Sequence, residues 1–529
     1  MPDLFFPSYT KKILSALNAA GYEAYLVGGA VRDLLLGKSP DDYDITTNAL
    51  PEQVLAVCSQ QGWKTVDQLG HNFGCVVIVI NGVATEVTTF RGERYNDDDM
   101  HRPAATWFCS SLREDLSRRD FTVNAMALSL DGTLYDYFGG QQDLQQKILR
   151  TVGDAKQRFH EDALRMLRAC RFVAQLGFTY EQTGCEALPA CGAPNTPYFL
   201  PHGYSFPVER RVERCAGLSL ERVRKELEKL ITSEYAGKGL MLMMATGLLG
   251  ASCHTRENGS DTVIPILPEA LHLLGLHQNP RFHLYDTWEH TLLALDNSPR
   301  DLAIRWALVL HDLGKGLPNV RKLNKEGQPS DPGHEAESTK MAKAILTRLG
   351  YNKSFVHLVT WLVAQHMRFA PMLLTGERTL LRWVRSEAAN SGFRTQAELT
   401  QAYSLLVEVF LADMGATHAR ENEQLMAEGR LLGRQVVELY AHACPYAPRI
   451  LLSADASCWS LFTRPKSKIF YPTCWNACSQ EICPTKKTLC SQQSISIKIA
   501  KLQSVQETTY ENKTHFTGHC LPNSHFGRP

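Results

Sequence analysis

Two aspartates spaced two positions apart are the first residues whose types and spacing could do chemistry. Asp42 and Asp44 lie in SPDDYDITTN, which follows an apolar run that ends in two glycines. On a strand, residues i and i+2 point to the same face, so both carboxylates would project together. A divalent cation offsets their repulsion, and Mg²⁺ prefers oxygen ligands. Glu86, in ATEVTTFR, is the candidate third carboxylate from an adjacent strand.

Such a carboxylate cluster has a defined use. It can hold two metals roughly 4 Å apart, which activate an attacking hydroxyl and stabilise a leaving pyrophosphate. A solvated turn is the alternative for Asp42 and Asp44, because Asp is common in turns and SPDD is turn-like.

The residues before the aspartates, LVGGAVRD, favour phosphate chemistry. Gly28 and Gly29 end a predicted strand and precede a predicted helix, a junction at which main-chain N–H groups approach phosphate oxygens. Arg32 adds a fork-shaped donor that suits phosphate. A simple tight turn is the alternative for the glycine pair alone. The order strand, Gly-Gly, helix and Asp-x-Asp is much more specific than either part.

A third pattern could select a base. EDALRMLRACR places Asp162, Arg165, Arg168 and Arg171 three residues apart, and i and i+3 are neighbours on a helix. A carboxylate that accepts from an exocyclic amine, beside a guanidinium that donates to a ring nitrogen, would accept cytosine and adenine but not uracil or guanine. The alternative is a surface helix with ordinary ion pairs.

Histidines and aspartates recur through a later helical region. His311 and Asp312 are adjacent in RWALVLHDLGKG, and further members lie upstream and downstream. Imidazoles and carboxylates in one helical bundle form a natural divalent-metal site. The candidate ligands are His290, His311, Asp312, His334, His366 and Asp413.

The first half of the chain resembles the class II nucleotidyltransferases, which include tRNA nucleotidyltransferases (CCA-adding enzymes) and bacterial poly(A) polymerases. The resemblance rests on LVGGAVRDLLLG…DDYDITT, EVTTFRGERY, LSRRDFTVNAMAL, DYFGGQQDLQQKILRTVGD, HEDALRMLRACRFVAQLGF and ERVRKELEKLI, in order over about residues 10–235. It implies template-independent addition or repair of the 3′-terminal CCA of tRNA from CTP and ATP, with release of pyrophosphate.

The resemblance also assigns roles. Asp42 and Asp44 would hold Mg²⁺ in the head, with Glu86 as a further catalytic carboxylate. Asp120 and Asn124 would support the sugar pocket. The residues that would contact CTP or ATP are Gly29, Arg32, Arg119, Asp162, Arg165, Arg168 and Arg171.

Residues 285–420 resemble the HD-domain metal-dependent phosphohydrolases. The resemblance implies a site for Mn²⁺, Ni²⁺, Fe²⁺, Mg²⁺ or Zn²⁺ that hydrolyses a phosphoester of a nucleotide, a cyclic phosphate or a damaged RNA end. Alternatives remain open for the whole chain. It could be a poly(A) polymerase, an enzyme that adds only CC or only A, an HD phosphohydrolase with an RNA-targeting head, or a non-catalytic RNA-binding protein.

The elements that must position these residues fall into four parts. We expect a nucleotidyltransferase head at 1–150, a helical nucleotide-templating neck and body at 151–280, an HD domain at 281–435 and an atypical, disordered tail at 436–529. The fold class is then an α/β (α+β) head with a mixed sheet, followed by an all-α neck and body and an all-α HD domain. An insertion near 193–215 and the Cys-rich tail depart from the family pattern.

Composition and charge restrict the expected partners and location of the protein. The chain has 529 residues and a formal net charge of +1, so any surface that binds nucleic acid must be local. Neither a membrane-spanning run nor a signal peptide is evident, which predicts a cytoplasmic protein without a membrane partner. The oligomeric state is not predicted.

Overall fold

A computed structural model of the chain describes residues 6–66, 74–95, 105–180, 198, 212–257, 260–372, 377–421 and 423–443. The chain divides into two compact units, of which the first comprises Met1–Phe369 and Gln396–Cys444 and the second Ala370–Thr395 and Pro445–Pro529. The described helices of the second unit are α15 (Glu377–Asn390) and most of α14 (Phe369–Met372). The other elements named below belong to the first unit.

A mixed sheet with the strand order β3-β4-β5-β2-β1-β8-β9 is the centre of the N-terminal region. Strand β2 runs parallel to β5, and the other neighbours in this sheet are antiparallel. AYLV, CVVIVI and ATEVTTF are rich in residues that favour strands, and each run forms a strand of this sheet. The bounds are β1 Ala24–Val27, β2 Ile45–Thr47, β3 Lys64–Val66, β4 Cys75–Ile80, β5 Val83–Thr89, β8 Met126–Leu128 and β9 Leu134–Asp136.

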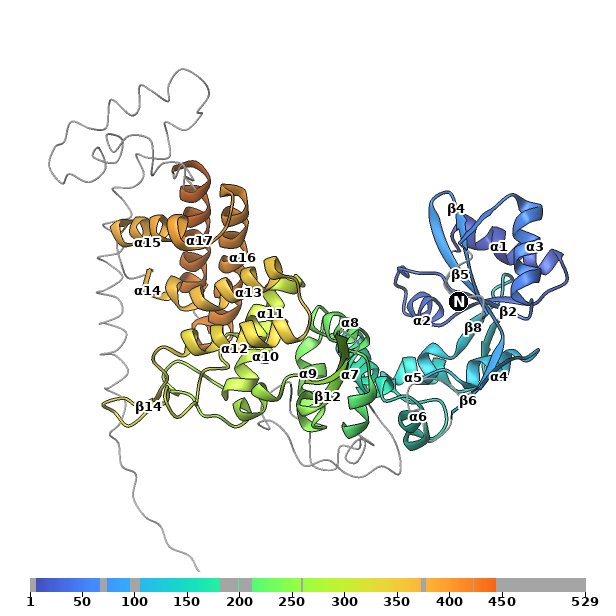
Figure 1. Ribbon diagram of the computed structural model, residues 1–529, viewed down its shortest axis with the longest axis horizontal. Helices are drawn as coiled ribbons and strands as arrows, with labels where there is room; N and C mark the ends of the chain where they lie inside the picture. The colour runs from blue at the N-terminus through green and yellow to red at the C-terminus, as the bar shows by residue number, and fades with distance from the viewer. Residues whose placement is uncertain are drawn as a thin grey trace, which may run out of the picture. The chain divides into compact units, whose positions relative to one another are not determined.

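Short helices pack on this sheet. Helix α3 packs against β4, and α1 packs against α3 and β1 (Figure 1). Helix α3 begins at a proline and ends before Gly62, whose φ of 69° is a left-handed conformation that favours glycine. The elements are α1 Ser8–Ala19, α2 Gly29–Leu35, α3 Pro51–Gln61, α4 Leu112–Ser117, the 3₁₀ turn η2 Thr122–Asn124, α5 Gly140–Gln146, and the ribbon β6 Arg91–Arg94 with β7 Ala105–Phe108.

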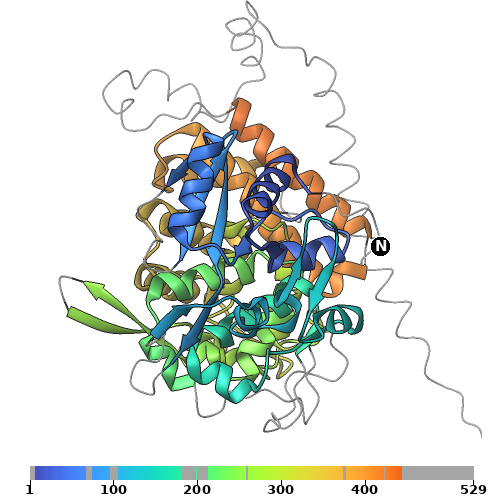
Figure 2. The ribbon, with the colours of Figure 1, turned by 90° about the vertical axis from the view of Figure 1, so that its right-hand side faces the viewer.

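The next region is mostly helical, as expected, but it contains an additional hairpin. Strands β12 (Ser252–Glu257) and β13 (Ser260–Pro265) pair antiparallel, and the hairpin extends away from the helices in Figure 2. The other elements are β10 Ile148–Leu149, α6 Ala155–Glu161, α7 Leu164–Leu176, β11 Thr179–Tyr180, η3 Val212–Gly217, α8 Leu220–Ile231, α9 Ala236–Ala245, η4 Leu248–Gly250 and η5 Pro268–Leu273.

The spacing of apolar residues in DAKQRFHEDALRMLRACRFVAQLGF predicts one helix, but this prediction is wrong because the structure breaks the helix at Asp162. This residue is extended, with φ −147° and ψ 111°, and separates α6 from α7. Its carboxylate accepts from the main-chain N–H of Leu164 at 3.0 Å and from Arg222 of α8 at 2.7 Å. Aspartate favours such caps over helix interiors, because its side chain competes for main-chain donors.

The region after residue 285 is a helical bundle with a short hairpin, β14 (Lys322–Leu323) with β15 (Pro329–Ser330). Asp286, Asp301 and Asn352 cap its first helices by accepting main-chain N–H groups. The helices are α10 Thr287–Asp296, α11 Leu302–Leu310, α12 His334–Arg348, α13 Lys353–Gln365, η6 His366–Arg368, α16 Gln396–Gly415, η7 His418–Glu421 and α17 Glu423–Ala443. A mixed-sheet head followed by helical regions confirms the expected fold class.

Two segments singled out in the sequence lie wholly or partly outside the described residues. The insertion near 193–215 lies outside the described residues, apart from Tyr198 and the residues from 212 onward. The expected tail lies outside them from residue 444, and α17 continues to Ala443. In the part of the chain that the structure describes, no helix is both long and apolar enough to cross a membrane.

Candidate active site and candidate metal centre

Three acidic residues meet at one end of the central strands of the head. Asp44 directly precedes β2, and its carbonyl accepts from the N–H of Val27 on β1 at 3.0 Å. Because Ile45 is paired with Val87 in the parallel β2–β5 ladder, Asp44 lies beside Glu86. Asp42 lies in the loop before Asp44. The expectation that both aspartates lie within the strand is wrong, because the strand begins at Ile45.

Electrostatics show that these carboxylates act on one another. Burial and the negative charge of Glu86 raise the pKa of Asp44 to about 6, with a further contribution from Asp42. The guanidinium of Arg119 opposes this shift. The like charges of these carboxylates repel one another, and a cation among the three would relieve that repulsion.

The glycine junction lies next to the same cluster. Gly28 has φ 71° and caps α2, and a Cβ added to it would lie 3.0 Å from Nη1 of Arg119. Arg32 of α2 donates to Oδ1 of Asn124 at 2.8 Å and also pairs with Asp33. The structure therefore brings the glycines, two arginines and Asn124 together, as the sequence predicts.

A second layer of charges connects α7 to the head. Arg168 donates from Nε to Oδ2 of Asp120 at 2.6 Å, and Asn124 donates to Oδ1 of the same carboxylate at 3.4 Å. Burial alone would raise the pKa of Asp120, but the Arg168 charge holds it below the usual range. Arg171 lies 2.6 Å from the Glu226 carboxylate of α8. Asp120, Asn124 and Arg168 thus form one hydrogen-bonded network.

The structure does not pair Asp162 with Arg165. Arg165 lies 2.6 Å from Glu161 and donates to the carbonyl of Arg118 at 3.2 Å. Asp162 is held by Arg222 instead. The expected side-by-side placement on one helical face is wrong in this conformation, because Asp162 lies in the break between helices.

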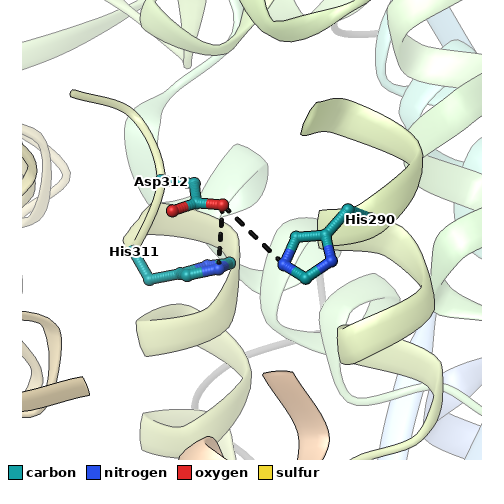
Figure 3. Close-up of side chains that lie close together, drawn as sticks. All are labelled: His290, His311 and Asp312. Carbon is teal, nitrogen blue, oxygen red and sulfur yellow. Dashed lines mark ion pairs between the residues drawn. The ribbon is translucent and has the colours of Figure 1, made fainter. Parts of the chain in front are cut away.

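A separate cluster of imidazoles and carboxylates lies within the helical bundle. Asp312 is central: its Oδ2 lies 3.2 Å from Nε2 of His311 and 3.8 Å from Nε2 of His290, as Figure 3 shows. Its Oδ1 lies 3.2 Å from Nε2 of His334. Because Nε2 of His334 lies 3.3 Å from that of His366, the cluster continues to this fourth histidine.

The sixth expected ligand lies in the same cluster. Oδ1 of Asp413 lies 2.9 Å from Nε2 of His290 and 3.7 Å from Nε2 of His311. The residues come from separate elements: α10 supplies His290, the end of α11 supplies His311 and Asp312, α12 supplies His334, η6 supplies His366, and α16 supplies Asp413. The structure therefore brings together all six residues that the sequence nominated.

Main-chain carbonyls orient the four imidazoles. Each Nδ1 lies within hydrogen-bond distance of a carbonyl, and because a carbonyl only accepts, Nδ1 carries the proton. Nε2 of each ring is then the atom that faces the cluster, an arrangement typical of metal-binding histidines. The four partners are Ala416 for His290, Leu308 for His311, Asp331 for His334 and Val363 for His366.

Nε2 of His290 and His311 and both carboxylate oxygens of Asp312 are buried, and they face one another, His334, Asp413 and Lys315. Burial opposes the charged imidazolium of His311, yet the Asp312 carboxylate raises its pKa to about 10. Two groups have the ligand spacing of a metal site, His290–His311–Asp312 and Asp312–His334–His366, so the donor set fits a divalent cation.

Comparison with known families places both clusters in recognised domains. Residues 24–150 match the poly A polymerase head domain, residues 207–251 match the probable RNA and SrmB-binding site of polymerase A, and residues 283–413 match the HD domain. The carboxylate cluster lies within the segment that matches the head domain, and the histidine cluster lies within the segment that matches the HD domain.

Relatives with both sequence and structural similarity extend this result. CCA-adding enzymes of Geobacillus thermodenitrificans and Geobacillus stearothermophilus are 46% and 44% identical over 236 residues, 45% of this chain and 52% of each relative. The chain thus spans about half the length of the curated relatives it matches. The crystal structure of Bacillus stearothermophilus CCA-adding enzyme in complex with CTP covers 89% of this chain and 93% of that one, with a TM-score of 0.53 and 26% identity. The expected resemblance is confirmed.

Sequence reasoning missed several residues of the two domains. In α8, Arg222 pairs with Asp162, and Glu226 pairs with Arg171 of α7. The two α8 residues are spaced i and i+4, which places them on one face of the helix. That spacing is the sequence pattern that could have identified them. In the head domain, Tyr95 lies under the Arg165 guanidinium at 5.8 Å. In the HD domain, Lys315 lies 2.7 Å from Asp312. The sequence shows Lys315 three residues after Asp312, but spacing alone does not assign it a partner.

Proposed function

We propose that this chain is a template-independent RNA nucleotidyltransferase that adds or repairs the 3′-terminal CCA of tRNA from CTP and ATP. The proposal rests mainly on the cluster of Asp42, Asp44 and Glu86 beside Gly28 and Arg119. This arrangement places candidate cation ligands next to a glycine turn that suits phosphate. The relatives named CCA-adding enzymes support the same activity.

The reaction is attack by the tRNA 3′-hydroxyl on the α-phosphate, with pyrophosphate as the leaving group. Asp42 and Asp44 would hold Mg²⁺, which would supply the positive charge that this step requires. Arg32, Arg119 and the main-chain N–H groups near Gly29 hold the triphosphate. Positioning and charge neutralisation are therefore the main contributions of the protein.

Helix α7 and the residues before it would select the nucleotide. Asp120 and Asn124 would support the sugar, and Arg168 and Arg171 would contact the CTP or ATP. Asp162 and Arg165 would accept from and donate to the Watson–Crick edge shared by cytosine and adenine. In the described conformation both side chains have other partners, so base recognition requires Arg165 to exchange Glu161 for the nucleotide.

One assay separates the candidate activities. The full chain is incubated with tRNA that lacks CCA, tRNA that ends in CC, and an oligo(A) primer, each with CTP, ATP, UTP or GTP. A CCA-adding enzyme extends the first primer with C, C and A, and the second with A alone. Extension of oligo(A) with ATP would instead indicate a poly(A) polymerase, and extension of only one tRNA primer would indicate a partial enzyme.

We further infer that the HD domain hydrolyses phosphoesters with a bound divalent cation. The support is the set of buried Nε2 and carboxylate atoms that have the spacing of metal ligands. His290, His311, Asp312, His334, His366 and Asp413 would hold the metal. The test is metal content by atomic emission, followed by hydrolysis of p-nitrophenyl phosphate and a 2′,3′-cyclic nucleotide. Metal-free protein with no turnover after Mn²⁺ or Ni²⁺ addition would refute it.

A further inference from the structure

His283 borders the metal cluster of the HD domain but is not one of its six nominated ligands. It lies in the segment before α10, and its ring packs edge to face against His290, with centroids 4.9 Å apart and planes at 88°. The residue is half-buried. Its ring therefore lies against a nominated ligand while part of the side chain remains accessible.

Main-chain hydrogen bonds fix the position of His283. Its N–H donates to the carbonyl of Asn279 at 3.1 Å. From the element after α16, His418 donates its main-chain N–H to Phe282 at 3.1 Å and its Nε2–H to Pro280 at 3.2 Å. The segment is thereby attached next to the helix end that supplies Asp413, so the position of His283 depends on the same elements that form the site.

The side chain of His283 differs from the other four imidazoles at this site. Each of those rings has Nδ1 at a main-chain carbonyl, whereas neither ring nitrogen of His283 has a hydrogen bond among the described residues. Its Nδ1 is also buried. Structures rarely leave buried polar atoms unpaired, and an unpaired one beside a functional cluster calls for a partner that is not part of the chain.

The groups beside His283 indicate the chemistry of that partner. Lys315 lies 2.7 Å from the Asp312 carboxylate and donates to Gln278 at 2.8 Å, so a cationic side chain borders the same cluster. An imidazole N–H and a lysine ammonium both donate hydrogen bonds to anionic oxygens, and a phosphate group supplies such oxygens.

We propose that His283 is a substrate-binding residue of the HD site, which donates a hydrogen bond to a phosphate oxygen of the phosphoester. The inference rests on the proposed hydrolase function and deepens it, because it names a residue outside the ligand set. His283 binds the phosphate group and is not needed to retain the metal.

The test compares variants of the full, Mn²⁺-loaded chain. We measure metal content by atomic emission, affinity for inorganic phosphate by calorimetry, and the kcat and KM for p-nitrophenyl phosphate. His283→Ala should weaken phosphate binding and raise KM by about tenfold or more, the loss expected for a hydrogen bond to a charged group, with metal content unchanged. His283→Asn, which keeps an N–H donor, should restore part of that loss. His277→Ala changes an exposed histidine in the same segment and should alter none of these values.

Unchanged phosphate affinity in His283→Ala, or loss of bound Mn²⁺, would overturn the inference. Wild-type protein that binds Mn²⁺ but no phosphate would overturn it as well. The proposed hydrolase function fails separately, if wild-type protein binds phosphate yet hydrolyses no ester. In that case the phosphate affinities still decide the role of His283.

Discussion

The Arg222 guanidinium lies 2.7 Å from the Asp162 carboxylate, and this ion pair joins α8 to the break between α6 and α7. The two residues are 60 positions apart in the chain. The pair fixes the acceptor proposed to read the base. Under the proposed function, the accuracy of base selection would depend on a residue that need not touch the nucleotide.

Arg222→Ala should lower discrimination between CTP and UTP while tRNA extension with CTP continues. The pair is partly exposed, so its loss is worth about 1 kcal/mol, or roughly a fivefold change in the ratio of kcat/KM values. Steady-state kinetics with tRNA lacking CCA measure this ratio. Lys225→Ala is the control, because Lys225 is exposed on the same helix. An equal drop in kcat/KM for CTP and for UTP would instead assign Arg222 a purely structural role.

Arg165→Ala should relax base choice more strongly. A mismatch that opposes buried polar groups costs about 1–3 kcal/mol, which corresponds to roughly 5- to 150-fold in discrimination. Arg158→Ala is a matched control, because Arg158 pairs with the same Glu161 at 2.9 Å but is not proposed to contact the base. Unchanged CTP-to-UTP discrimination in Arg165→Ala would remove the templating proposal.

Local patterns predicted the elements that depend on neighbouring residues. The glycine junction at Gly28, the β-branched strands and the ordered histidines of the HD domain all appear where the sequence places them. The break at Asp162 was not predictable from periodicity, because a distant partner, Arg222, stabilises it. The β12–β13 hairpin was missed because its strands, SCHTRE and SDTVIP, are largely polar and lack a buried alternating face.

The roles of the site residues were harder to predict than their identities. The types and order of the residues predicted all six candidate ligands of the HD site, because imidazoles and carboxylates grouped in a helical bundle have few purely structural roles. The partners of charged side chains depend on tertiary geometry, which the sequence does not encode locally. Arg165 illustrates this point: three-residue spacing favoured Asp162, but the fold pairs it with Glu161.

Asp44→Asn should abolish nucleotide incorporation with little effect on folding. The asparagine keeps the shape of the side chain but removes the charge that would bind Mg²⁺. Because burial and Glu86 raise the pKa of Asp44, its charge is unfavourable in the metal-free fold. The unfolding temperature in EDTA should therefore equal or exceed that of the wild type. Asp41→Asn, one position before Asp42, is the control. Measurable incorporation by Asp44→Asn would contradict the metal assignment.

Asp312→Asn should remove metal from the HD domain without loss of tRNA extension by the head. Asp312 lies within 4 Å of three candidate ligand histidines, so its neutral variant removes the central charge of the cluster. A cation bound only to the folded state stabilises it, and wild-type protein should therefore unfold at a lower temperature after chelation. Asp312→Asn should show no such shift, whereas Asp261→Asn, on the exposed β13 strand, should respond as the wild type does.

Metal content by atomic emission and thermal unfolding with and without EDTA provide the measurements. A full metal complement in Asp312→Asn would show that the cation binds elsewhere, and a parallel loss of tRNA extension would show that the two domains do not act independently.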